Sequence, residues 1–205
     1  MVIRDKILFL GAGGHGLVLA DIAKKIGYKE IKFLDDQANK YFTYEIIGRL
    51  NDFSKYQESY DLFVSIGNNK VREKITKRLN QKNCHQVNLI HPSSVLSESV
   101  SIAEGICIMP NVVINAQSQI GTGCILNTSS SIDHEAVIKD FVHISPGCHL
   151  SGQVTIGERC WLGTGCNIIN NITICDNCII GAGATIIKNI DTSGTYISMP
   201  LRRIK

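Results

Sequence analysis

The chain has 205 residues, of which 44% are hydrophobic, so it can bury the core of one medium-sized domain or of two small ones. Its formal net charge of +3 is too small to indicate nucleic-acid binding. No signal segment opens the chain, and no apolar run approaches the roughly 18 residues that a spanning helix needs. We therefore expect a cytoplasmic protein that does not insert into a membrane.

Residues 1–88 begin with a pattern that predicts a Rossmann-like βαβ unit. Lys6 to Leu10 is a short apolar strand, and it is followed by the glycine turn Gly11-Ala12-Gly13-Gly14-His15-Gly16. Leu17 to Ile26 has helical spacing, and Ile31 to Leu34 is a second strand that ends in Asp35-Asp36. The turn matches G-x-G-x-x-G, and the acids follow about twenty residues later.

A second loop is predicted beside this glycine turn. A further strand, Tyr60 to Ile66, ends in Gly67-Asn68-Asn69 and precedes a charged helix from Val71 to about Asn80. Open parallel sheets bind ligands where such loops meet, and a helix N-terminus offers free N–H groups to a phosphate. The pattern favours a nucleotide site without specifying NAD. The alternative is that the glycines only make tight turns.

The segment from Tyr41 to Tyr56 carries aromatic and charged residues without a period. We expect a loop with a short helix there, lying over the sheet.

Residues 89–190 have a six-residue period that predicts a β-helix. Every sixth residue from Ile90 to Ile186 is Ile or Leu, seventeen positions in all, and the fourth residue after each is usually small. An α-helical period of about 3.6 residues drifts away from this step, so we interpret each hexad as one short strand with its aliphatic side chain inside. Three hexads form one triangular coil, and each residue should stack on the equivalent residue three hexads later. Residues 191–205 are predicted to be a C-terminal tail.

His134 is the strongest catalytic candidate in this region. Ile132-Asp133-His134-Glu135 places a histidine at a corner with a carboxylate beside it. A solvated polar corner is the common interpretation of such a pair. The three-hexad stacking, however, places His134 under Gly152, whose N–H can face the same reacting atom. A base, a carboxylate that orients it and a backbone donor favour acyl transfer. His143 should stack in the same way under Trp161.

Cysteines and histidines also raise the possibility of disulfides or zinc. Five of the eight cysteines occupy the small inward position of a hexad, where a thiol acts as a small hydrophobe, and this argues against a disulfide framework. The histidines at 134, 143 and 149 occupy different phases of the coil, so they should not converge on zinc. Cys178 points inward and Cys175 should point away from it, so this C-x-x-C pair is not expected to form a metal site.

Several of these segments together resemble one family. They are the hexads, Asn127-Thr128-Ser129-Ser130, Asp133-His134-Glu135, the segment from Phe141 to Gly147, and the N-terminal glycine and Asp-Asp motifs. In combination they resemble the sugar acetyltransferases of the left-handed β-helix superfamily, in particular the UDP-4-amino-sugar N-acetyltransferases of the kind that finishes N,N′-diacetylbacillosamine. The longer segment from Tyr41 to Tyr56 departs from that pattern at the sugar end of the site.

The resemblance implies a fold, an activity and an assembly. An α/β N-terminal Rossmann-like domain should bind a nucleotide sugar, and a left-handed parallel β-helix of hexapeptide repeats should bind acetyl-CoA between two chains of a homotrimer, without a metal. The expected reaction is N-acetylation of the 4-amino group of a UDP- or dTDP-linked sugar by direct attack. Two alternatives stay open: a sialic-acid-type sugar O-acetyltransferase, and a non-catalytic trimeric scaffold that binds a nucleotide.

The resemblance also assigns residues. It makes His134 the general base, gives Glu135 the task of raising its basicity, and lets His143 contact acetyl-CoA. Further contacts with CoA, in coils above the base, are expected from Gly152, Thr164, Thr173 and Ala182. Contacts with the nucleotide sugar are expected from Gly13, Gly14, His15, Asp35, Asp36, Gly67 and Asn127.

Overall fold

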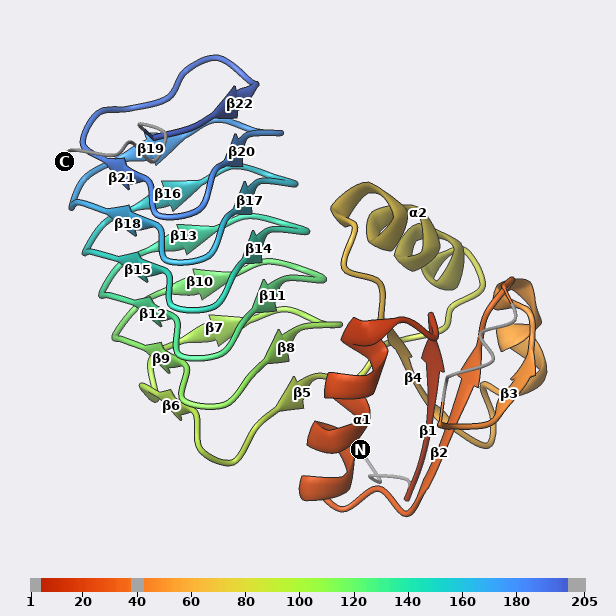
Figure 1. Cartoon of the computed structure of the whole chain (residues 1–205). Coiled ribbons are helices and arrows are strands. Elements are labelled where there is room, and N and C mark those ends of the chain that lie inside the picture. Colours follow the sequence, from red (N-terminus) through yellow and green to blue (C-terminus); the bar gives the residue numbers. More distant parts are fainter. Residues whose placement is uncertain (1–4, 38–42, 199–205) are drawn as a thin grey trace, which may run out of the picture.

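The structure, a computed structural model, describes residues 5–37 and 43–198. It has two parts, a small α/β unit and a column of short strands (Figure 1). Residues 41–42 of the segment predicted as a loop, and residues 199–205 of the predicted tail, lie outside the described residues.

The α/β unit contains a parallel sheet of four strands in the order β3-β2-β1-β4. Its strands are β1 (Lys6–Leu10), β2 (Glu30–Leu34), β3 (Ile46–Gly48) and β4 (Asp61–Val64). The helices are α1 (Gly14–Lys25), the 3-10 helix η1 (Leu50–Lys55) and α2 (Asn69–Asn80). The predicted strands and helices are therefore all present, and β3 is an additional strand that the sequence analysis missed.

Both helices that follow a ligand-facing loop start earlier than predicted. Gly13 is the N-cap of α1 in an extended conformation, and α1 begins at Gly14. Asn68 is the N-cap of α2, and its side chain accepts a hydrogen bond from the backbone N–H of Val71. The first turns of α1 and α2 thus include the loop residues themselves, as expected for glycine and asparagine at helix starts.

The column is a parallel β-helix in which every predicted hexad forms a two-residue strand. Its three sheets have seven, six and five strands, and the hexad strands that are neighbours within each sheet are three hexads apart, as in the pairing of Ser131 with His149. The strands of the seven-stranded sheet are β5 (Leu89–Ile90), β8 (Cys107–Ile108), β11 (Ile125–Leu126), β14 (His143–Ile144), β17 (Trp161–Leu162), β20 (Ile179–Ile180) and β22 (Thr195–Tyr196).

The other two sheets complete the triangular section. The six-stranded sheet contains β6 (Val95–Leu96), β9 (Val113–Ile114), β12 (Ser131–Ile132), β15 (His149–Leu150), β18 (Asn167–Ile168) and β21 (Thr185–Ile186). The five-stranded sheet contains β7 (Ser101–Ile102), β10 (Gln119–Ile120), β13 (Val137–Ile138), β16 (Thr155–Ile156) and β19 (Thr173–Ile174). β22 lies within the predicted tail, and it adds a strand to the first sheet.

The small inward residues do more than fill space. The Sγ atoms of Cys124 and Cys148 donate to carbonyl groups 15 residues later, at 3.1 Å in each case, and Ser118 Oγ donates in the same way to Asp133 at 2.9 Å. Each such donor satisfies a corner carbonyl of the next coil. All eight cysteines are free. Buried thiols are therefore used here as small donors as well as small hydrophobes.

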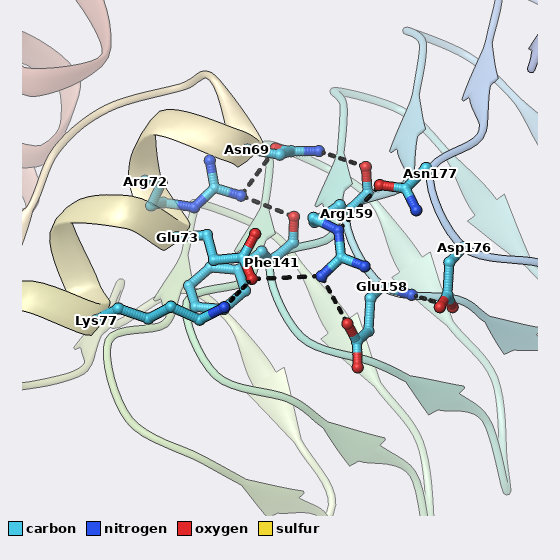
Figure 2. Close-up of polar contacts among 9 residues, drawn as sticks. All are labelled: Asn69, Arg72, Glu73, Lys77, Phe141, Glu158, Arg159, Asp176 and Asn177. Atoms are coloured by element: carbon cyan, nitrogen blue, oxygen red, sulfur yellow. Dashed lines mark hydrogen bonds and ion pairs between the residues drawn. The ribbon is translucent and has the colours of Figure 1, made fainter. Parts of the chain in front are cut away.

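Residues of α2 join the two parts of the chain (Figure 2). The buried guanidinium of Arg72 donates to the carbonyl groups of Gly123 at 2.7 Å and of Phe141 at 3.0 Å. Asn69 Nδ2 donates to the carbonyl groups of Arg159 at 3.1 Å and of the next residue at 3.0 Å. The α/β unit is thus fixed on the corner of the column between the five- and seven-stranded sheets. No helix among the described residues is both long and apolar enough to cross a membrane.

Candidate active site

His134 and Glu135 form a pair at the corner that follows β12. The distance from His134 Nδ1 to Glu135 Oε2 is 3.0 Å, and the two side chains are 53% and 47% exposed. Gln153 Nε2 donates to the same carboxylate oxygen at 3.2 Å. A carboxylate on Nδ1 favours the tautomer in which Nδ1 carries the proton and Nε2 is a free acceptor.

Gly152 lies directly over this imidazole, as the three-hexad register predicts. A Cβ atom built on Gly152 would stand 2.5 Å from His134 Nε2. The backbone N–H of Gln153 donates to the His134 carbonyl at 2.9 Å, so the two coils are in register at this corner. The free ring nitrogen therefore faces the Gly152 backbone.

Two polar residues that the sequence analysis missed hold this corner. Asn115 Nδ2 donates to Asp133 Oδ1 at 3.0 Å, and this hydrogen bond is the main cause that lowers the Asp133 pKa. The same carboxylate oxygen accepts from the His134 backbone N–H at 2.9 Å. Asn115 lies three hexads before Asp133, and Gln153 lies three hexads after Glu135, so the stacking rule contained the signal that would have found both.

His143 lies on β14, away from this corner. Its ring stacks on Trp161, with 5.9 Å between ring centroids and 10° between the planes, as the register predicts. Asn127 Nδ2 lies 3.4 Å from His143 Nε2. Burial, then the charge of Arg72, lowers the pKa of His143 to about 3. His143 is therefore neutral and can act as a hydrogen-bonding group but not as a cation.

The glycine turn is open to solvent at the two positions singled out from the sequence. A Cβ atom at Gly13 or Gly14 would meet nothing within 4 Å. Asp35 Oδ2 accepts from the Ala12 backbone N–H at 2.6 Å and closes the turn, while Asp36 Oδ1 accepts from the Leu50 N–H at 3.1 Å. Both carboxylates thus have backbone partners in this structure.

His15 carries an unsatisfied polar atom. Its Nε2 is buried and lacks a hydrogen-bond partner among the described residues. Burial, followed by the charge of Arg72, lowers the pKa of His15 to about 4. An orphaned acceptor or donor at this place is what a site for a polar ligand would leave in the empty protein.

A cavity of about 510 Å³ opens beside the ring of His143. Its wall combines the loop after β4 with the exposed side of the seven-stranded sheet and the neighbouring corner. The lining residues are Gly67, Asn68, Asn69, Lys70, His143, Arg159, Trp161, Asn177 and Ile179. The mixture of an aromatic ring, amides and two cations suits a polar, anionic ligand with a flat part.

The candidate residues do not all meet within one chain. His134, Glu135 and Gly152 are on the corner between the six- and five-stranded sheets. The cavity and the α/β unit lie at a different corner, the one between the five- and seven-stranded sheets. Thr164 and Ala182 occupy corners between the seven- and six-stranded sheets, and Thr173 begins β19. Of the four residues predicted to face CoA above the base, only Gly152 is stacked over His134.

The prediction for the C-x-x-C pair was wrong in its geometry. The sulfur atoms of Cys175 and Cys178 lie 3.5 Å apart, so Cys175 does not point away from its partner. The corner residues between the two cysteines turn the Cys175 side chain back toward the column. Within residues 5–37 and 43–198, no group of three or more His, Cys, Asp or Glu side chains is placed to hold a metal ion.

Comparison with known families and proteins gives consistent matches over both parts. The family described as "PglD N-terminal domain" matches residues 6–79, and "Bacterial transferase hexapeptide (six repeats)" matches residues 153–188. UDP-N-acetylbacillosamine N-acetyltransferase of Bacillus subtilis (strain 168) is 31% identical over 109 residues, which is 50% of each chain.

Two solved structures match nearly the whole chain. The acetyltransferase domain of PglB from Neisseria gonorrhoeae FA1090, solved in complex with acetyl coenzyme A, has a TM-score of 0.91 and 36% identity over 97% of this chain and 100% of that one. A His-to-Asn mutant of perosamine N-acetyltransferase from Caulobacter crescentus, in complex with CoA and GDP-perosamine, has a TM-score of 0.89 and 32% identity over 95% and 94%. The predicted fold, a Rossmann-like domain followed by a left-handed parallel β-helix, is confirmed.

Proposed function

Since this chain belongs to the hexapeptide-repeat sugar acetyltransferase family, we propose that it transfers the acetyl group of acetyl-CoA to the 4-amino group of a nucleotide-linked sugar. The observation that carries the proposal is the stacked arrangement of Glu135, His134 and Gly152. It places a carboxylate on Nδ1 of His134 and the Gly152 backbone against Nε2, which is the arrangement that a base and a backbone oxyanion donor would need. Two of the relatives described above are named N-acetyltransferases and the third is an acetyltransferase domain; the two solved complexes contain acetyl-CoA, or CoA together with GDP-perosamine.

The mechanism is direct attack. The sugar amine attacks the thioester carbon, and His134 Nε2 takes the amine proton while Glu135 stabilises the imidazolium through Nδ1. The Gly152 N–H donates to the oxyanion of the tetrahedral intermediate. The C–S bond then breaks, the proton passes to the departing sulfur, and free CoA and the acetamido sugar leave.

The substrates need sites on both sides of this centre. We assign the nucleotide sugar to the glycine turn with Gly13, Gly14 and His15, and to the cavity that Gly67 and His143 line. The relatives differ in the nucleotide, since one name contains UDP and one title contains GDP. The base of the nucleotide is therefore to be determined with a panel of UDP-, dTDP- and GDP-linked 4-amino sugars. A cytoplasmic location remains a prediction.

Separation of the base from the cavity supports a trimer in which each site is shared. The corner of one chain that carries His134 would face the cavity of its neighbour, and acetyl-CoA would lie between the two β-helices. Exposed apolar side chains fit this arrangement: Trp161 is 47% exposed, Ile179 is 43% exposed, and both line the cavity. Such side chains on one sheet need cover that a single chain does not give.

The test of the function is thiol release from acetyl-CoA with an amino-sugar nucleotide. Because the proton transfer occurs in the transition state, His134→Ala should lower kcat by about 10²–10⁴-fold and leave KM for acetyl-CoA nearly unchanged. His149→Ala is the matched control and should keep full activity. His149 lies on β15, the strand that pairs with β12, and so it is close to the corner of His134 without being part of it.

The two alternatives give different results in the same assay. An O-acetyltransferase would release thiol with a hydroxyl acceptor and not with the amine. A scaffold would bind nucleotide without any release. A His134→Ala variant as active as the unmodified chain would remove the proposed mechanism.

A further inference from the structure

The polar network at the corner next to the cavity ends on the loop that carries Asp176 and Asn177 (Figure 2). Arg159 Nε donates to Asn177 Oδ1 at 2.9 Å, and the Glu158 backbone N–H donates to Asp176 Oδ1 at 2.9 Å. Both acceptors lie between Cys175 and Cys178. This loop therefore helps to position Arg159, which lines the 510 Å³ cavity and also contacts Glu158 at 2.6 Å and Glu73 at 3.4 Å through Nη1.

The two thiols are close and differ in access. Their sulfur atoms are 3.5 Å apart, Cys175 is partly exposed, and Cys178 is buried. Cys175 also lines a second cavity of about 460 Å³, together with Asp176 and Asn177, so this residue borders the solvent whereas Cys178 is buried. A disulfide needs a separation of about 2.05 Å, so the sulfurs must approach by about 1.5 Å.

The loop between the cysteines must absorb this approach. The Cys175 backbone N–H donates to the Ile190 carbonyl at 2.8 Å, and the Cys178 N–H donates to Cys160 Sγ at 3.4 Å. Both ends of the loop are thus held in their coils. Between them the Asn177 N–H donates to the Glu158 carbonyl at 2.8 Å, so any movement of Asp176 and Asn177 is passed to the corner that carries Arg159.

We propose that Cys175 and Cys178 are a redox-active dithiol, and that closing their disulfide moves Arg159 and changes the adjacent cavity. Nothing in the transfer reaction uses these two residues. An oxidant that reacts with the dithiol would then change the cavity that Arg159 lines, although neither cysteine lines that cavity.

The chemistry is balanced with hydrogen peroxide as the oxidant. The Cys175 sulfur attacks one peroxide oxygen, the O–O bond breaks, and one water leaves as Cys175 becomes a sulfenic acid. The Cys178 sulfur then attacks the Cys175 sulfur, the S–S bond forms, and the hydroxyl leaves with the Cys178 proton as a second water. Burial raises the pKa of Cys178 to about 12, so the first nucleophile is Cys175. The thiols lose two electrons and two protons in total.

Intact-protein mass spectrometry of the full chain after peroxide treatment tests the dithiol. Disulfide formation should lower the mass by about 2 Da, and dithiothreitol should reverse the loss. The loss should be absent in Cys175→Ser and in Cys178→Ser. Cys148→Ser is the matched control, because Cys148 is fully buried on the inward row and Ser118 occupies an equivalent position. That variant should still lose the two mass units.

Peptide mapping should place the new bond between residues 175 and 178. A mass loss that persists in Cys175→Ser, a bond mapped to other cysteines, or no mass loss in the unmodified chain would each overturn the proposal.

Fluorescence tests the coupling to the cavity. Trp161 is the only tryptophan of the chain, and it lines the cavity together with Arg159 and Asn177. Oxidation should shift its emission, dithiothreitol should restore it, and Cys175→Ser should show no shift. An oxidised chain with the disulfide in place and unchanged emission would disprove the coupling to Arg159.

Discussion

The position of the His134 ring depends on a residue that has no side chain. A Cβ atom at position 152 would stand 2.5 Å from Nε2 and 2.6 Å from Cε1 of His134, so Gly152→Ala must push the ring away. Displacing a catalytic group by about 1 Å can cost about 10²-fold in rate. We expect kcat for thiol release to fall by a factor of that order.

A double variant separates this effect from general damage. If alanine at position 152 acts through the imidazole, Gly152→Ala combined with His134→Ala should be no slower than His134→Ala alone. Circular dichroism should show an unchanged fold. Losses that multiply in the double variant would show that Gly152 acts independently of the base.

The buried histidines make stability depend on pH. The pKa values of His15 and His143, about 4 and about 3, are lower than the value of about 6.5 in an unfolded chain. Below about pH 6.5 the unfolded chain therefore binds more protons than the folded one. The free energy of unfolding is highest above this pH and decreases as the pH falls toward 4. The urea midpoint should be lower at about pH 5 than at about pH 7.5.

Replacing one of these rings should reduce the dependence. His143→Gln cannot be protonated, so its midpoint should fall less over the same pH interval. His85→Gln changes a side chain that is 81% exposed, and it should behave like the unmodified chain. Equal midpoints at the two pH values in the unmodified chain would contradict the buried, neutral state of these rings.

Much of the residue-level geometry could be predicted because one rule governs it. Stacking over three hexads placed Gly152 over His134 and Trp161 over His143, and both contacts are present. The same rule failed for Cys175, because the hexad phase fixes where a strand side chain points but not how a corner residue turns. The stacking rule also gives no information on contacts between the two parts of the chain, such as those of Arg72.

At the scale of elements, α2 joins the α/β unit to the column through several polar contacts, of which those of Arg72 are the most buried. Arg72 is 2% exposed and donates to carbonyl groups of both parts, including those of Gly67 and Phe141. Arg72→Met would keep the bulk and leave these carbonyls buried without donors, at about 1–3 kcal/mol for each group. We expect a loss of several kcal/mol in urea denaturation, with the two parts unfolding in separate transitions.

A second arginine on the same helix serves as the control. Arg78 donates to Asn51 at 3.1 Å in an exposed contact. Arg78→Met should therefore change stability by less than about 1 kcal/mol. A single cooperative transition with normal stability in Arg72→Met would show that other contacts hold the parts together.

Some secondary-structure elements could be predicted from the sequence and others could not. The short strands of the column could all be predicted, because an unbroken six-residue period of Ile and Leu fits a β-helix with these side chains inside and does not fit an α-helix. β3 could not, because Ile46-Ile47-Gly48 gives only two apolar residues between polar ones. That strand exists through its pairing with β2, where Phe33 is opposite Ile46, and such long-range pairing leaves no local pattern.

At the scale of the whole molecule, a shared site predicts complementation between inactive chains. His134→Ala removes the base, and Gly14→Val should block the nucleotide sugar without a clash inside the protein, because the space around Gly14 is open. After the two variants are unfolded and refolded together in equal amounts, about one quarter of the sites should combine an intact base with an intact sugar site. Thiol release should recover to about that fraction.

The controls are each variant refolded alone, and the two variants mixed without unfolding. All of these should stay inactive if the chains do not exchange. A refolded mixture that is no more active than the separate variants would place the base and the sugar in one chain and remove the shared-site arrangement.

β22 closes the C-terminal end of the seven-stranded sheet, and the shape of this end affects whether chains can add to one another end to end as fibrils. Stacked parallel strands end in unpaired backbone groups, and an open end of this kind is a template for another copy of the same coil. Here the aliphatic step stops after Ile186, since the next position is Thr192, and a shortened coil places Thr195 opposite Ile179 in a parallel pair. The last coil thus spans 16 residues instead of 18, so it does not present the regular repeat that another coil would match, and no further coil follows it among the described residues. An irregular terminal coil discourages end-to-end addition, so association should proceed through the sides of the column and give particles of finite size.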